Sequence, residues 1–236
     1  MTMADWLHIL VFGYYPYFAA TVFLAGSLIR FDREQYTWRS GSSQLLRRRQ
    51  LVWGSVLFHI GILLLFLGHF VGLLTPTEIY HAFGLSSGAK QVLAIVAGGI
   101  FGVVCLVGLT MLLHRRLFDP RIRRTSSPMD IAILAILWVQ LVLGLATLPL
   151  SWAHREHGEV MVTLSLWAQK IVTFQADAAL HVADVSWVYK AHIFLGVTIF
   201  LIFPFSRLVH IWSAPVGYLG RRGYQVVRTR EGRRVA

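Results

Sequence analysis

The feature that most constrains this chain is a set of five apolar stretches, each long enough to cross a lipid bilayer. A helix needs about 20 residues to span about 30 Å of hydrocarbon. The stretches cover residues 6–29, 51–74, 91–113, 130–150 and 187–212. Charged residues make up only 14% of the 236-residue chain and gather between these stretches. The sequence therefore predicts an all-α membrane protein with five transmembrane helices.

The basic residues predict how this protein sits in the membrane. Of the 22 Lys and Arg residues, 17 lie in the first connection, the third connection and the C-terminal region. The connections on the other side contain only Lys90, Arg155, Lys170 and Lys190. The positive-inside rule then places the N-terminus outside (periplasmic) and the C-terminus in the cytoplasm. Basic residues at headgroup depth indicate contact with membrane lipid and not with nucleic acid.

The remaining organisation is simple. We expect residues 1–220 to form one five-helix domain and residues 221–236 a basic cytoplasmic tail. No positive charge precedes the first apolar stretch, which predicts a retained span and not a cleaved signal peptide. The lone cysteine, Cys105, lies within an apolar stretch and is expected to be a packing residue. The connection over residues 151–186 has apolar residues at near-helical spacing, which predicts a short surface helix.

Apart from His8, at the start of the first stretch, four of the ten histidines lie inside the apolar stretches, where an ionisable side chain is a candidate for function. His59 and His69 lie in the second stretch, and His192 and His210 lie in the fifth. Because the two helices run in opposite directions, His59 and His210 share a depth toward the cytoplasmic side. His69 and His192 share a depth toward the outer side. Two imidazoles from facing helices, with no thiolate nearby, suit a haem iron better than zinc.

The spacing of these histidines does not fit two straight helices. Ten residues separate His59 from His69, which is about 15 Å along a helix, whereas eighteen residues separate His192 from His210, about 27 Å. Ten residues also turn His69 about 80° away from His59. We therefore expect tilted helices, or a bend near Pro204, to bring both pairs together.

Other chemistry remains open for the same four histidines. Zinc binding, a proton relay and simple hydrogen bonding between helices are alternatives, although the matched pairs without accompanying carboxylates favour haem. The other six histidines lie near the ends of the stretches or in connections, where water can solvate them. They are His8, His81, His114, His154, His157 and His181. We expect no haem ligand among these six.

Several sequence blocks resemble one known family. They are DREQYTWRSGSSQ, LFHIGIL, GHFVGLLTP, AGGIFGVVCLVG, RRLFDPR and PFSRLVHIWSAPVGYL. With these blocks the chain resembles, over nearly its whole length, the gamma subunit of the membrane-bound respiratory nitrate reductase, a diheme cytochrome b. The resemblance implies a multi-pass protein of the bacterial inner membrane that binds two haem b groups.

The resemblance also implies the roles of individual residues. It implies that His59 and His210 ligate the inner haem, and that His69 and His192 ligate the outer haem. It implies a quinol site formed by Gly68, His69 and Lys90 beside the outer haem. The sequence alone favours an interfacial lysine whose ammonium reaches the headgroups, and only the resemblance assigns Lys90 to the quinol site.

The function implied is oxidation of menaquinol or ubiquinol near the outer face, with electrons passing through both haems. The partners implied are an iron–sulfur beta subunit and an alpha subunit whose molybdenum cofactor reduces nitrate. The chain would then be the quinol-oxidising subunit of an enzyme complex, and nitrate is inferred only from the resemblance. The alternatives are a cytochrome b subunit of a hydrogenase, a formate dehydrogenase or a sulfur-cycle complex, and a haem-free membrane anchor or transporter.

Overall fold

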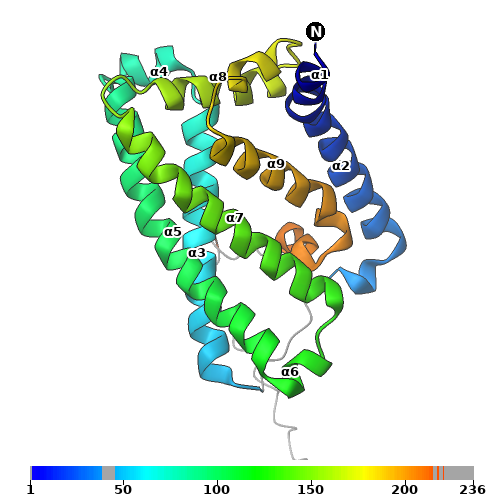
Figure 1. The fold of residues 1–236 in the computed structure, drawn as a ribbon. Coiled ribbons are helices and arrows are strands. Elements are labelled where there is room, and N and C mark those ends of the chain that lie inside the picture. The colour runs from blue at the N-terminus through cyan, green and yellow to red at the C-terminus, as the bar shows by residue number, and fades with distance from the viewer. Residues whose placement is uncertain (1, 39–45, 215–216, 218–219, 221–236) are drawn as a thin grey trace, which may run out of the picture.

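The computed structural model of the chain describes residues 2–38, 46–214, 217 and 220, and over these residues it contains helices and no strand (Figure 1). Five helical segments are long and apolar enough to cross a membrane. The predicted fold class, an all-α membrane protein with five spanning helices, is confirmed. The predicted basic tail over residues 221–236 lies outside the described residues.

The elements follow one another in a simple order. They are α1 (Met3–Ile9), η1 (Leu10–Tyr14), α2 (Tyr15–Arg33), η2 (Gln35–Thr37), α3 (Arg48–Leu74), α4 (Thr77–Ala82), α5 (Ser87–Phe118), α6 (Pro120–Arg124), α7 (Pro128–Ala153), α8 (Glu159–Val172), η3 (Ala178–Val182), α9 (Trp187–Ile202), η4 (Phe203–Phe205) and η5 (Arg207–Ser213). The spans match the predicted stretches, except that the fifth is helical only to Ile202 before shorter turns take over.

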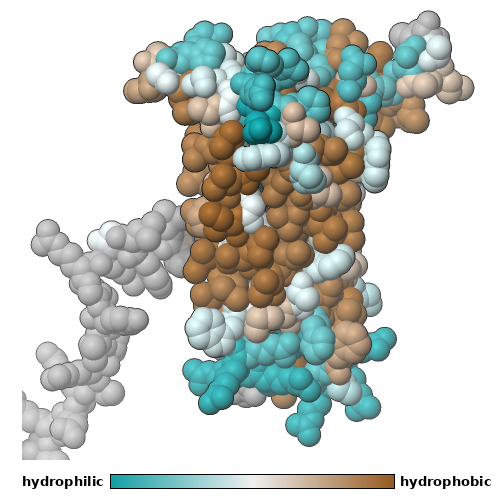
Figure 2. Space-filling model, turned by 60° about the vertical axis from the view of Figure 1, so that its left-hand side comes forward, coloured by the Kyte–Doolittle hydropathy of each residue, from teal (hydrophilic) through white to brown (hydrophobic). Residues whose placement is uncertain are grey.

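The spanning helices pack in the order α3, α5, α7, α9 and α2. The short helices α4 and α8 lie across one end of the bundle, which we call the α8 end, and α6 lies at the opposite α6 end (Figure 1). A hydrophobic band covers the middle of the molecule between two hydrophilic ends (Figure 2). This pattern is the surface expected of a protein that crosses a bilayer. Its orientation in the membrane stays a prediction.

Small residues bring α3 and α5 into close contact. A Cβ atom added to Gly61 would lie 2.5 Å from the Cβ of Cys105, and one added to Gly108 would lie 2.3 Å from the backbone nitrogen of Phe58. Glycine at these two points therefore lets the helix backbones approach one another. Cys105 is fully buried in this contact, in agreement with its predicted role in packing.

The predicted surface helix is present as α8, but one side of it is buried against the bundle. The indole Nε1 of Trp167 donates a hydrogen bond to the carbonyl oxygen of Phe12 at 3.0 Å. That carbonyl lies in the π-helical turn η1, four residues before Pro16. Pro16 has no backbone N–H and cannot donate to this carbonyl as the residue at that position of an α-helix would, whereas the indole does donate to it. This contact fixes α8 to the first span.

Candidate functional site

The four intramembrane histidines form two facing pairs. The ring centroids of His59 and His210 are 6.4 Å apart, and those of His69 and His192 are 6.2 Å apart. The first pair lies toward the α6 end and the second toward the α8 end, so the structure brings together the residues that were matched by depth.

The mismatch in spacing is resolved by a break in the fifth span. Helix α9 ends at Ile202, and the chain continues through the 3₁₀ turns η4 and η5 around Pro204. The orange segment after α9 turns back toward the bundle instead of extending the helix (Figure 1). His210 lies on η5, so its position does not follow from a straight helix of eighteen residues. The predicted bend near Pro204 is confirmed.

Each of the four histidines has its Nδ1 atom next to a backbone carbonyl oxygen. The carbonyl belongs to Ser55 for His59 (2.7 Å), to Leu65 for His69 (2.8 Å), to Gln140 for His192 (3.2 Å) and to Arg207 for His210 (2.6 Å). A carbonyl oxygen only accepts hydrogen bonds, so Nδ1 must carry the proton and donate. In a neutral imidazole the other nitrogen, Nε2, then keeps its lone pair. Ring N–H groups that donate to carbonyls are typical of histidines that bind metals.

The separation within each pair fits a metal ion held between two imidazoles. A metal–nitrogen bond of about 2.0 Å and a ring centre about 1.1 Å beyond the nitrogen put two opposed ring centroids about 6.2 Å apart. No group of three or more His, Cys, Asp or Glu residues in the described parts of the chain could hold a metal ion. A site with two protein ligands suits an iron whose other ligands come from a porphyrin, and does not suit structural zinc.

The face of α3 that contains His59 also presents apolar side chains. Leu63, Phe66 and Phe70 follow His59 at helical spacing and are exposed in the chain alone, by 66%, 58% and 59%. An apolar wall of this kind suits the flat, largely hydrophobic body of a haem.

Helix α7 contributes two residues that the sequence analysis missed. The side-chain amide of Gln140 donates to the backbone carbonyl of His192 at 3.1 Å. A Cβ atom added to Gly144 would lie 2.9 Å from the Cε1 atom of His192, so only glycine leaves room for the ring. The sequence does contain a sign of both residues, because Gln140 is a polar residue in the middle of an apolar stretch and Gly144 follows it one helical turn later.

Lys90 is buried at the start of α5, with 7% of its surface exposed. Its Nζ atom lies 3.9 Å from the centre of the Tyr80 ring and 3.5 Å from the carbonyl oxygen of Thr75, the residue that follows α3. This burial argues against an interfacial lysine whose ammonium lies among the headgroups. His69 precedes Thr75 by six residues, so the two lie about 9 Å apart along α3. Gly68, beside His69, has no atom within 4 Å of an added Cβ.

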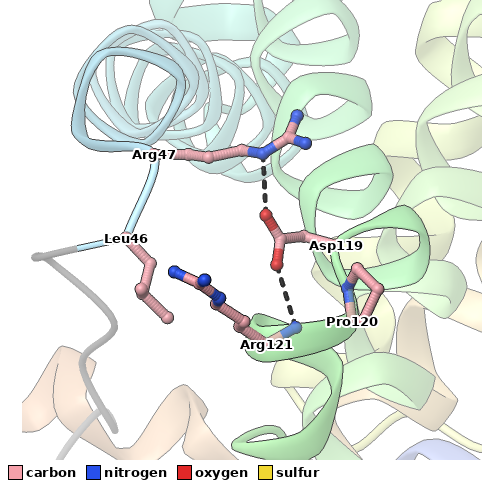
Figure 3. A pocket seen from close by; sticks show the side chains of 5 residues that line it. All are labelled: Leu46, Arg47, Asp119, Pro120 and Arg121. Atoms are coloured by element: carbon pink, nitrogen blue, oxygen red, sulfur yellow. Dashed lines mark hydrogen bonds and ion pairs between the residues drawn. The ribbon is translucent and has the colours of Figure 1, made fainter.

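A second, basic site lies at the α6 end, away from the histidine pairs. A pocket of about 480 Å³ is lined by Leu46, Arg47, Asp119, Pro120 and Arg121 (Figure 3). Burial raises the pKa of the Asp119 carboxyl, but two backbone N–H donors and the Arg47 guanidinium at 2.7 Å outweigh this and hold it below its usual value. Asp119 therefore stays ionised and joins the connection before α3 to the end of α5. The pocket contains no histidine.

The fold and the paired histidines together define the class of the protein: an integral membrane protein with the ligand arrangement of a membrane cytochrome b. The comparison with known families then gives the particular family. The chain belongs to the nitrate reductase gamma subunit family, whose model matches residues 8–230. It is accordingly a multi-pass inner-membrane protein and a subunit of an oxidoreductase complex.

Individual relatives match almost the whole chain. The respiratory nitrate reductase 1 gamma chain of Escherichia coli (strain K12) is 50% identical over 226 residues, which cover 96% of this chain and 99% of the relative. The respiratory nitrate reductase 2 gamma chain of the same organism is 50% identical over 97% of this chain and 100% of the relative. The nitrate reductase gamma chain of Bacillus subtilis (strain 168) is 38% identical over 94% of this chain and 98% of the relative.

Proposed function

We propose that this chain is the diheme cytochrome b subunit of a respiratory nitrate reductase. In this proposal it oxidises menaquinol or ubiquinol near the outer face and passes the electrons to an iron–sulfur beta subunit. An alpha subunit with a molybdenum cofactor reduces the nitrate. The observation that carries the proposal is the two histidine pairs, whose ring centroids lie 6.4 and 6.2 Å apart and whose Nδ1 atoms each lie next to a backbone carbonyl oxygen.

Two haem b groups would supply one-electron transfer between the two sides of the membrane. The Nε2 atoms of His59 and His210 would hold the inner haem, and those of His69 and His192 the outer haem. The backbone carbonyls fix the four ring orientations, and the apolar face of α3 excludes water. About 15 Å separates the two sites along α3, which is about half of the hydrocarbon thickness.

The quinol site in this proposal lies at the α8 end, which we place outside the cytoplasm by the positive-inside rule. Lys90 would hydrogen-bond a quinol oxygen beside the outer site, and Gly68 would leave room next to His69. The buried Lys90 ammonium at the end of α3 supports this role. The nitrate acceptor and the two partner subunits come from the family relationship, because the described part of the chain has no cysteine or carboxylate cluster for their cofactors.

A haem count tests the proposal directly. The complex purified with this chain should contain two b-type haems per chain in a reduced-minus-oxidised spectrum. His59→Ala or His210→Ala should remove the inner haem. His69→Ala or His192→Ala should remove the outer haem and quinol oxidation. Retention of both haems in any of these variants would show that the ligands are wrong.

A further inference from the structure

Three polar side chains at the α8 end form a continuous hydrogen-bonded chain. The Tyr80 hydroxyl lies 3.1 Å from the Ser87 hydroxyl, and the Ser87 hydroxyl lies 3.2 Å from Nε2 of His81. Tyr80 is buried, with 6% of its surface exposed, whereas His81 is exposed. This series of hydrogen bonds therefore leads from the interior of the α8 end to solvent.

Tyr80, the buried end of this hydrogen-bonded series, lies against Lys90. The Lys90 ammonium lies over the face of the Tyr80 ring, 3.9 Å from its centre, a favourable cation–π position. Within the described residues Lys90 has no carboxylate within ion-pair distance. A buried cation without an acidic partner favours a bound group that becomes negative, such as a quinol oxygen that loses its proton.

The position of Ser87 is fixed by close packing of the neighbouring loop. A Cβ atom added to Gly88 would lie 2.5 Å from the carbonyl oxygen of Glu156, and one added to Gly158 would lie 2.4 Å from the carbonyl of Ser87. Gly158 also has a positive φ of 70°, which other residues rarely adopt. The loop before α8 therefore holds the start of α5 in one place. Ser87, the middle residue of the hydrogen-bonded series, is held with it.

We propose that Tyr80, Ser87 and His81 form the path by which protons leave the quinol site. This inference rests on the proposed function. Oxidation of one quinol breaks two O–H bonds, sends two electrons to the haems and releases two protons. For each proton, Tyr80 accepts at its hydroxyl and passes its own proton to Ser87, which passes one to Nε2 of His81. His81 then releases the proton to water, and all three residues return to their starting state.

The test uses variants that break the path at single atoms in the full complex. Tyr80→Phe and Ser87→Ala each remove one hydroxyl, and His81→Gln removes the terminal base. His181→Gln, a histidine on η3 outside the path, is the matched control. Reduction of the haems by quinol is followed optically in a single turnover, and proton release from vesicles is followed with a pH-sensitive dye. Without any turnover, ¹⁵N NMR of labelled histidines reports the hydrogen bond at His81 Nε2 in wild type and in Ser87→Ala.

Proton transfer by positioned groups contributes about 10²–10⁴-fold to rates. We therefore expect proton release and haem reduction to slow by about tenfold or more in each path variant, with a larger solvent isotope effect. Haem content and affinity for a quinol-site inhibitor should match those of wild type. A further variant, His81→Ala, leaves space for an imidazole, and added imidazole should restore its proton release. The control should behave as wild type.

Two results would overturn the inference in different ways. If Tyr80→Phe and Ser87→Ala release protons at the wild-type rate while Lys90→Ala abolishes quinol oxidation, the proton path is wrong and the quinol site stands. If Lys90→Ala also oxidises quinol at the wild-type rate, the proposed quinol site is wrong, and the path that begins there is wrong with it.

Discussion

The guanidinium of Arg30 donates a hydrogen bond to the carbonyl oxygen of Pro204 at 2.6 Å. The same Nη1 atom donates to the carbonyl of Ser206 at 2.9 Å, and Nη2 donates to that of Thr37 at 3.0 Å. Arg30 lies near the end of α2, whereas Pro204 lies in η4 and Ser206 directly precedes η5, the turn that carries His210. Arg30 on the first span therefore fixes the turn at Pro204 in the fifth span. That turn directs His210, a proposed haem ligand, toward His59.

Arg30→Lys tests this link. A lysine keeps the charge but cannot reach several carbonyls with a planar fork, and a buried carbonyl left unsatisfied costs about 1–3 kcal/mol. We expect the haem proposed at His59 and His210 to lose occupancy or to shift in potential, while the haem proposed at His69 and His192 is unchanged. Redox titration of the two b-type absorbances measures this. Arg33→Lys, an exposed arginine on the same helix, should change neither haem.

A change at Gln140 should affect only the other histidine pair, His69 and His192. Gln140→Leu removes the amide that donates to the backbone of His192 at 3.1 Å but leaves the carbonyl that orients its ring. It also removes a buried oxygen, Oε1, that has no hydrogen-bond partner, so the loss of stability should stay within about 1 kcal/mol. We expect an altered paramagnetic resonance signal for the outer haem only. A changed inner signal, or a change in the lipid-facing control Val139→Leu, would contradict this role.

Trp167 and Pro16 should be coupled energetically. Trp167→Phe removes the indole donor to the carbonyl of Phe12 and should lower the free energy of unfolding by about 1–3 kcal/mol. Pro16→Ala restores a backbone N–H that can reach that carbonyl, so Trp167→Phe should cost less in this background. Thermal unfolding in detergent, followed by circular dichroism for the two single variants and the double variant, measures the coupling. Equal costs in both backgrounds would show that proline does not cause the indole contact.

The sequence predicted the fold and the histidine pairs because both depend on residue type and depth alone. Apolar length defines the five spans, and opposite helix directions match His59 with His210 without any knowledge of packing. The sequence also predicted a bend near Pro204, since the two histidine spacings could not otherwise agree. It could not show how the chain turns after Ile202, because that path depends on Arg30, which is distant in sequence.

Two features of the candidate site also depended on tertiary contacts. Gln140 and Gly144 belong to a helix without histidines, so only the packing of α7 against α9 shows that they contact His192. The burial of Lys90 against Tyr80 likewise follows from the fold of the connection after α3, and apolar spacing carries no information about it. The resemblance identified Lys90, whereas the structure shows what surrounds it.

Two glycines of α3 provide a matched pair that separates the fold from the quinol site. Gly61→Ala would place a Cβ 2.5 Å from that of Cys105, in the contact between α3 and α5. The helices must then move apart, and we expect both haems to be lost or weakly bound. Gly68→Ala meets no atom within 4 Å, so the fold and both haems should persist. If Gly68 borders the quinol site, this variant should still bind a quinol-site inhibitor several-fold more weakly. Wild-type inhibitor affinity and quinol kinetics in Gly68→Ala would place the quinol elsewhere.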